Sequence, residues 1–212
     1  MNTLTKDEFT DYISFQLTHF FPDNQNPKAI IFKNFDEAMD RMHYSLKHVK
    51  LKGYTQFSHL QSDLYAQFIY YLSNTIWKDD NNSTVPIKLF YLNKALHGIN
   101  CMYDTQLPDI FLLIHCIGTV LGKASYSNYF VACHNVTIGS DKGYSPKINE
   151  GVYLGPGSSI VGKCIIGTYS HFSINSVVLN QNTKDNCVVI GSGSNFVLKD
   201  LKRNLIYEQY FI

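Results

Sequence analysis

The chain has 212 residues, of which 45% are hydrophobic and 17% charged, so it can form a sizeable core and is not a disordered polymer. With 18 basic and 17 acidic residues, its net charge of +1 offers neither a basic field for DNA or RNA nor an acidic tail. Five scattered cysteines without a CxxC pair indicate reduced thiols rather than a disulfide framework. No signal-peptide pattern opens the chain, and its longest apolar stretch, near 110–122, is too short for a bilayer. We therefore expect a cytoplasmic protein with no membrane span and no nucleic-acid partner.

Helical periodicity marks the first 98 residues. Thr5 and Glu8 form a capping-box pattern, apolar residues then recur on one face, and Pro22 ends the run. Pro86 suits a first helical turn, and Gly98 suits the position just past a helix end. This half is therefore predicted to be a small helical domain. Two further helices are expected between these signals, at 34–49 with Asn34 as the cap and at 58–77, followed by a polar break at 79–83.

After Gly98 a period of six replaces the helical period. Large apolar residues recur at this spacing, and small residues follow several of them four places later. In a parallel β-helix each hexad supplies one strand and one turn, three hexads make a triangular coil, and each coil buries its face only by stacking on the next. We predict an α+β chain with a helical domain at 1–98, a β-helix at 99–195 and a tail at 196–212 that caps the open end. The in-phase markers are Ile148, Leu154, Ile160, Ile166, Phe172 and Val178, and the small residues are Ser158, Cys164, Ser170 and Ser176.

Eight polar or turn-forming residues, 140–147, interrupt the hexads between Ile138 and Ile148. Such a segment does not fit a stacked wall, so we expect it to leave the wall as a loop. Loops on a rigid scaffold frequently carry function. The sequence therefore predicts that this loop borders the functional site.

From about Leu89 to Ser194 the chain resembles the hexapeptide-repeat acyltransferases, most closely the serine acetyltransferase group. The segments IHCIGTVLG, HNVTIGS, PKINEGVYLGPGSSIVGKCIIG and SINSVVL carry the resemblance, together with a helical domain that leads into the repeat. The resemblance implies a left-handed β-helix and a homotrimer, with a dimer of trimers left open. It also implies that acetyl-CoA, the acyl donor, binds in the cleft between neighbouring subunits. No metal is expected.

The same resemblance makes His115 the general base. A hydroxyl is a poor nucleophile until its proton is removed, and an imidazole that titrates near neutrality suits this task. The thioester carbonyl then needs a backbone N–H donor, which Gly139 or Ser140 would supply at the loop entrance. Lys184, near the end of the repeat, is either a contact for the CoA phosphates or a solvated residue of the tail. The resemblance places Gly139, Ser140, Pro156, Gly157 and Ile174 along the pantetheine groove.

One departure from the serine acetyltransferase pattern concerns the base itself. Asn100 lies fifteen residues before His115, where the group has an Asp that orients the base. Asn can accept a hydrogen bond from the ring, but it cannot stabilise an imidazolium as a carboxylate does. We predict that Asn100 takes the orienting position, with Asp104 and Asp109 as the nearby acids that could substitute.

Two further departures concern the acceptor. Ile114 stands where the group has an Asp that helps to hold the amino group of serine. Tyr144 and Ser145 stand where the group has an Arg–His pair that helps to hold the serine carboxylate. Because burying an ammonium group beside Ile carries a desolvation penalty, a neutral hydroxyl suits this site better than free serine. We expect Tyr144, Ser145 and His134 to contact the acceptor.

The sequence therefore predicts an acetyl-CoA-dependent O-acetyltransferase that acts on a sugar hydroxyl of a surface polysaccharide or its precursor. The run from LFYLNKALHGIN to LPDIFLLIH is similar to serine acetyltransferase-like proteins of bacterial capsule and O-antigen biosynthesis. Two alternatives remain open, a true serine O-acetyltransferase and a non-catalytic β-helix scaffold. A γ-type carbonic anhydrase would use three histidines, two of them five apart, and no two of His115, His134 and His171 have that spacing.

Overall fold

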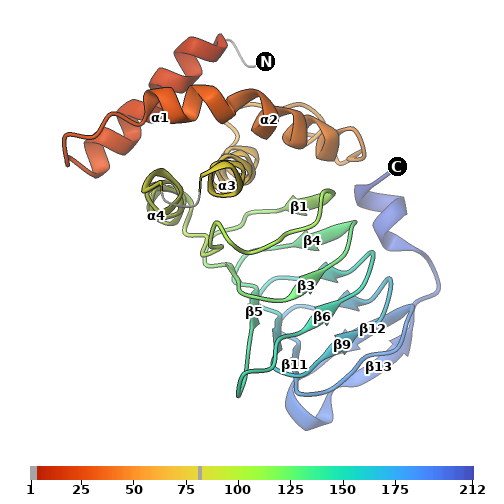
Figure 1. The fold of residues 1–212 in the computed structure, drawn as a ribbon. Coiled ribbons are helices and arrows are strands. Elements are labelled where there is room, and N and C mark those ends of the chain that lie inside the picture. The colour runs from red at the N-terminus through yellow and green to blue at the C-terminus, as the bar shows by residue number, and fades with distance from the viewer. Residues whose placement is uncertain (1–3, 81–82) are drawn as a thin grey trace.

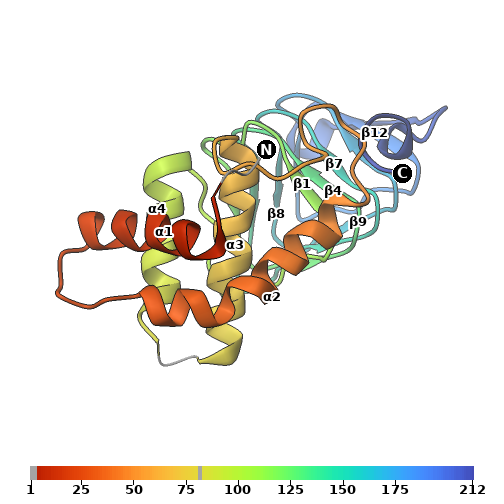
Figure 2. The same ribbon diagram turned by 90° about the horizontal axis from the view of Figure 1, so that it is seen from above.

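A layer of helices lies across one end of a triangular β-helix (Figure 1). The computed structural model describes residues 4–80 and 83–212. Figure 2 shows the helical layer from above, with the solenoid beneath and beside it. This arrangement confirms the predicted fold class, a helical domain followed by a parallel β-helix. The helices are α1 (Lys6–Phe20), α2 (Lys28–Leu46), α3 (Ser62–Asp79) and α4 (Val85–His97).

Three sheets form the faces of the prism, and every strand pair is parallel except the last, β12 with β13. The first face contains β1 (Phe111–Leu113), β4 (Phe130–Ala132), β7 (Tyr153–Leu154), β10 (His171–Phe172), β12 (Cys187–Ile190) and β13 (Val197–Asp200). The second face contains β2 (Val120–Leu121), β5 (Thr137–Gly139), β8 (Ser159–Val161) and β11 (Val177–Leu179). The third face contains β3 (Ser125–Tyr126), β6 (Lys147–Ile148) and β9 (Ile165–Ile166).

The apolar residue of each hexad points into the prism. Ile148 pairs with Ile166, and Ile160 pairs with Val178, so partners in these coils are eighteen residues, or three hexads, apart. All four side chains are fully buried. Because parallel strands one coil apart are in register, the period of six places one apolar residue per face over its counterpart in the next coil.

The small residues of the repeat lie at the corners, and they also make hydrogen bonds there. The hydroxyls of Ser158, Ser170 and Ser176 are buried, and each donates to the carbonyl three residues earlier at 2.7 Å. A side chain of this size fits inside the corner and satisfies a carbonyl that the turn leaves without a strand partner. The choice of serine is therefore explained by hydrogen bonding as well as by space.

The starts of two helices differ from the sequence prediction. The capping box of Thr5 and Glu8 starts α1 as predicted, and Gly98 ends α4 in the left-handed conformation. Helix α2, however, begins at Lys28, so the prediction of Asn34 as its cap is wrong: Asn34 is buried inside the helix and donates to the Ile30 carbonyl. Helix α3 begins at Ser62 rather than 58. The predicted polar break includes residues 81–82, which lie outside the described residues.

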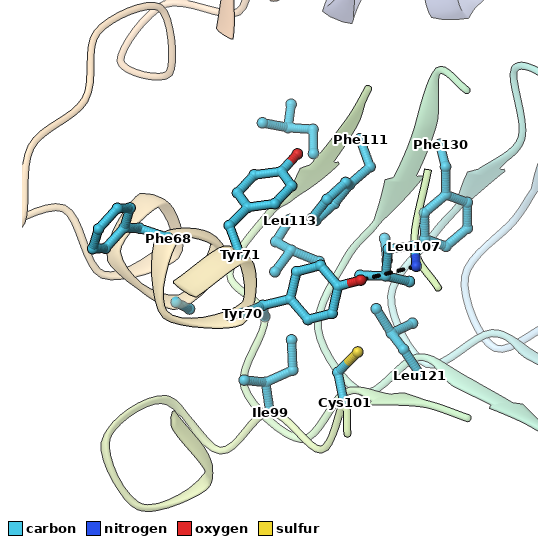
Figure 3. Close-up of a cluster of buried hydrophobic side chains, with 14 of the residues drawn as sticks. Phe68, Tyr70, Tyr71, Ile99, Cys101, Leu107, Phe111, Leu113, Leu121 and Phe130 are labelled. Atoms are coloured by element: carbon cyan, nitrogen blue, oxygen red, sulfur yellow. Dashed lines mark hydrogen bonds between the residues drawn. The ribbon is translucent and has the colours of Figure 1, made fainter. Parts of the chain in front are cut away.

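Helix α3 closes the N-terminal end of the prism. Tyr70 and Tyr71 project from it toward the first coils, where both rings meet Phe111 (Figure 3). Phe68 projects from the opposite side of α3 and packs against Phe9 and Phe35 of the other helices. The Tyr70 hydroxyl donates to the Thr105 carbonyl at 2.7 Å and accepts from the Leu107 N–H at 2.9 Å. The buried apolar residues of the helices and of the prism consequently form one continuous core.

The C-terminal tail connects the last coil with the helical layer. Strand β13 pairs antiparallel with β12, and the chain then runs back along the outside of the first face to the helical layer (Figure 1). There the short helix Ile206–Tyr210 places Tyr210 in a stack with Tyr153, and Phe211 pairs with Val49 just after α2. The tail therefore ties the last coil to the first helices.

Ile165 and Ile166 test the inward register, because they are neighbours on β9 with opposite exposure, 49% and 0%. We expect Ile166→Ala to lower the free energy of unfolding by about 2–5 kcal/mol, since it leaves a cavity in the prism. Ile165→Ala is the matched control and should cost less than about 1 kcal/mol. Chemical denaturation of both variants measures the difference, and equal losses would contradict the register.

Candidate active site

His115 lies on an extended corner between the first and second faces. Register pairs Leu113 with Ala132 on the first face and Val120 with Thr137 on the second. Six residues, 114–119, therefore lie between the two strands in the first coil, and four, 133–136, lie between them in the next. The first coil is two residues longer at this corner, and His115 lies within the longer turn.

A buried carboxylate from the helical layer holds this turn. His115 has a φ of +50°, a left-handed conformation that is strained for a residue with a side chain. Its backbone N–H donates to Asp63 Oδ2 at 2.8 Å, and the next N–H, of Cys116, donates to Asp63 Oδ1 at 3.1 Å. Two successive N–H groups that converge on an anion form a backbone nest, and charge strengthens both hydrogen bonds. Asp63 therefore stabilises the strained turn.

The imidazole of His115 points away from the prism interior. Its side chain is 76% exposed, whereas that of Asp63 is 6% exposed, and Nδ1 of the ring lies 3.9 Å from Asp63 Oδ2. An exposed ring can reach a ligand outside the prism, and the adjacent carboxylate is within ion-pair distance of the protonated ring. This geometry suits a proton acceptor.

The residues predicted to orient His115 make other contacts in the structure. Asn100 pairs with Val120 at the edge of the second face, where its N–H donates to the Thr119 carbonyl at 2.8 Å. Across the described part of the chain, the Asn100 side chain makes no hydrogen bond to the ring. Asp104 faces Lys123 at 3.6 Å, and the backbone carbonyl of Asp109 accepts from the Tyr71 hydroxyl. The orienting role of Asn100 stays a prediction.

Several predicted site residues share the corner of His115. Hydrogen bonds between successive coils stack Ile117, His134, Pro156 and Ile174 in one line along it. Ile117 and Ile174 are 65% and 69% exposed, and the other two are half-buried. The corner thus presents a largely apolar ridge, interrupted by His134, below the His115 turn.

Gly157 has a structural reason to be glycine on this ridge. Its φ is +71°, and a Cβ there would lie 2.2 Å from Oδ1 of Asn175 in the next coil. The positive φ and this close approach both favour a residue without a side chain. Gly157 is therefore fixed by the fold, whatever binds beside it.

The interrupting loop lies at a different corner, between the second and third faces. Gly139 ends β5, and Ser140, Tyr144 and Ser145 follow it with exposed side chains. Within one chain, the whole second face therefore separates these residues from His115.

This loop is a tight turn fastened to the prism. Asp141 and Tyr144 exchange backbone hydrogen bonds, and the two residues between them, Lys142 and Gly143, have positive φ, as a type I′ turn requires. The Asp141 carboxylate accepts from the Asn180 amide at 2.8 Å. The predicted excursion from the wall is present, and it is rigidly held.

Lys184 lies near the far end of the prism, away from both corners. It follows β11 and forms an exposed ion pair with Asp200 on β13, which raises the pKa of Lys184 and lowers that of Asp200. Its charge is therefore already matched by a neighbour.

The histidines do not form a metal site. His171 lies on β10, where its ring stacks against Tyr153 at 4.2 Å, on a face rather than at the corner of His115. Over residues 4–80 and 83–212, no three His, Cys, Asp or Glu side chains lie close enough together to hold a metal ion. In the same ranges, every helix falls short, in length or in apolar character, of what a bilayer span requires.

Asp63 is the site residue that sequence reasoning missed. It lies in the first turn of α3, where acidic residues commonly favour the helix dipole, and 52 residues separate it from His115. No local pattern distinguishes an Asp that stabilises its own helix from one that reaches another part of the chain. Only the packing of α3 on the prism reveals the contact.

Sequence comparison finds relatives among the serine acetyltransferases, and no family model matches the chain. The chain is 32% identical over 156 residues to the serine acetyltransferase of Haemophilus influenzae, covering 68% of this chain and 55% of that enzyme. It is 28% identical over 112 residues to that of Synechococcus elongatus, covering 50% and 46% respectively. The chain thus spans about half the length of the curated relatives it matches.

Solved structures share the fold over a larger part of the chain. A serine acetyltransferase in complex with CoA covers 92% of this chain with a TM-score of 0.72 and 19% identity, over 85% of its own length. The Neisseria gonorrhoeae serine acetyltransferase covers 96% with a TM-score of 0.76 and 19% identity, over 83% of its length. The fold is therefore that of the hexapeptide-repeat acyltransferases. Within that class the chain is serine acetyltransferase-like, which confirms the resemblance predicted from its sequence.

His97, at the end of α4, makes a testable contribution to stability. Burial lowers its pKa from 6.5 to about 4, although the nearby charge of Asp63 opposes the shift. Since the unfolded chain binds this proton at higher pH than the folded chain, stability is complete above pH 6.5 and falls as the pH drops toward 4. The loss is up to roughly 3 kcal/mol.

Replacing the histidine should flatten this dependence. We expect His97→Gln to reduce the slope of unfolding free energy against pH between 6.5 and 4, as measured by denaturation at several pH values. His19→Gln removes an exposed histidine at the end of α1 and serves as the control. If His97→Gln and wild type keep the same slope, the assignment is wrong.

Proposed function

We propose that this chain is an acetyl-CoA-dependent O-acetyltransferase of the serine acetyltransferase type, with His115 as the general base. The observation that carries the proposal is the exposed imidazole on an extended corner, 3.9 Å from a buried carboxylate and above an apolar ridge. The sequence relatives and structure neighbours, which bear the name serine acetyltransferase, support the same activity.

In the proposed reaction, His115 accepts the proton of the acceptor hydroxyl as its oxygen attacks the thioester carbonyl. The new carbon–oxygen bond forms, the carbon–sulfur bond breaks, and the imidazolium returns its proton to the CoA thiolate. The products are an O-acetyl ester and CoA. A general base must lie within hydrogen-bond reach of the proton it removes. The exposed ring of His115 can be reached by an acceptor hydroxyl, and the fixed turn holds the ring in place.

The apolar ridge fits the pantetheine arm of acetyl-CoA. Solved neighbours include serine acetyltransferases in complex with CoA. Here Pro156, Gly157 and Ile174 offer a largely apolar surface along the same corner, in the coils below His115, which suits the methylene groups of the arm. Lys184 is less suited to the CoA phosphates, because Asp200 already pairs with it, although an exposed pair of this kind is easily exchanged.

A homotrimer would complete the proposed site. His115 lies at one corner of the prism, whereas Gly139, Ser140, Tyr144 and Ser145 lie at the next corner. A neighbouring copy packed against the second face would bring its loop corner to the His115 corner of the first chain. In that arrangement the backbone N–H of Gly139 or Ser140 would face the oxyanion, and Tyr144 and Ser145 would face the acceptor.

Serine is the first candidate for the acceptor, because the relatives are named for that activity. The sequence prediction, a sugar hydroxyl of a surface polysaccharide or its precursor, is the second candidate. It is favoured by one observation: half-buried Ile114 and the uncharged Tyr144 and Ser145 offer no charged group to a zwitterion. The two acceptors differ in charge, so a direct assay separates them.

The test is release of CoA thiol from acetyl-CoA in the presence of serine or of a panel of sugars and nucleotide sugars. We expect turnover with at least one acceptor and a loss of about 10²–10⁴-fold in kcat for His115→Ala, since general base catalysis contributes that much. His19→Ala should keep full activity, because His19 is exposed at the end of α1.

The outcomes separate the candidate functions. Turnover with serine supports a serine O-acetyltransferase, and turnover with a sugar alone supports the sequence prediction. If the protein binds no CoA and releases no thiol with any acceptor, the proposal is overturned and a non-catalytic scaffold is favoured.

A further inference from the structure

We infer that Asp63 is the positioning residue for His115, which fixes the turn that carries the base and supplies the negative charge beside the imidazolium. The inference rests on the proposed function and adds a residue to it. The negative charge beside His115 thus comes from a residue of helix α3. It does not come from position 100, where the serine acetyltransferase group has an Asp and this chain has Asn100.

The carboxylate of Asp63 is held by three donors. Oδ2 accepts from the Tyr54 hydroxyl at 2.6 Å and from the His115 N–H at 2.8 Å, and Oδ1 accepts from the Cys116 N–H at 3.1 Å. A buried carboxylate with both oxygens engaged has one orientation. The position of the His115 turn therefore follows that of Asp63.

The backbone that carries Asp63 is itself rigid. Asp63 lies in the first turn of α3, whose N-terminus is capped by the Gln61 side chain accepting from the Leu64 N–H at 2.8 Å. The rest of α3 packs into the core over the first coil (Figure 3). A site held by a packed helix keeps its geometry better than one held by a loop alone.

The groups around this carboxylate are shifted toward their neutral forms, so the charge there belongs to Asp63. Burial raises the pKa of the Tyr54 hydroxyl and of the Cys116 and Cys133 thiols, and the Asp63 charge raises each of them further. Burial lowers the pKa of His97 to about 4, which leaves it uncharged near neutral pH. When His115 takes up a proton, the ion-pair partner within reach of Nδ1 is Asp63, at 3.9 Å.

The test compares Asp63→Asn with two controls in the thiol-release assay. We expect Asp63→Asn to lower kcat by about 10²-fold or more, to keep the KM for acetyl-CoA within about threefold, and to move the acidic limb of the pH–activity profile to lower pH. Without the negative charge, the imidazolium that forms during the reaction has lost the carboxylate within ion-pair distance of its Nδ1. Tyr54→Phe removes a hydrogen bond from the same cluster but keeps the charge, and Asp104→Asn removes a carboxylate that faces Lys123.

Tyr54→Phe should lower the melting temperature but keep kcat within about threefold of wild type, and Asp104→Asn should match wild type in activity. Equal losses of kcat in Asp63→Asn and Tyr54→Phe, or an acidic limb that does not move, would show a merely structural role and overturn the inference.

If Asp63→Asn does not fold, the variant Asp63→Glu provides the test instead. It keeps the charge but displaces it by one methylene, so a reduced kcat with an unchanged acidic limb supports the inference, and a wild-type kcat overturns it.

Wild-type activity separates this inference from the proposed function. If wild type shows no turnover with any acceptor, the proposed function fails. If wild type turns over and Asp63→Asn is equally active, the inference alone fails.

Discussion

The stacking of one coil on the next is the constraint on which this structure depends. Each short strand buries its apolar residue only when the neighbouring coil is in register, as in the pairs Leu154 with Phe172 and Ile160 with Val178. Once the register is set, residues at equivalent places fall into lines along the corners. A coil that keeps its strands paired can therefore gain residues only at a corner. The first coil gains two where His115 lies, and the loop 140–147 leaves at the next corner, so both departures from the repeat occur where a ligand can reach them.

The helical layer is part of the candidate site rather than an appendage. Helix α3 shares the core of the first coils through Tyr70, Tyr71 and Phe111, and the same helix delivers Asp63 to the turn of His115. The tail returns to this layer and pairs Phe211 with Val49. A β-helix without the helices would expose its first coil and would leave a left-handed histidine without the carboxylate that holds its backbone.

The features that sequence reasoning predicted are those with a local signature. The hexads, the capping box of α1 and the left-handed Gly98 each depend on residues within a few positions of one another, so a period or a motif reports them. The start of α2 was missed because Asn34 has the chemistry of a cap but is buried within the helix. Asp63 was missed because its partner is 52 residues away, and Asn100 drew attention because it occupies the expected position in a pattern. Contacts between distant segments follow from packing, which no period encodes.

The most direct test of this account is a crystal structure of the protein with CoA bound. The account predicts that the CoA sulfur lies within about 4 Å of the His115 ring, that the pantetheine arm follows the ridge formed by Pro156 and Ile174, and that the loop 140–147 of a neighbouring copy closes the site. CoA bound away from this corner, or a solitary chain whose His115 faces only solvent in the complex, would contradict it.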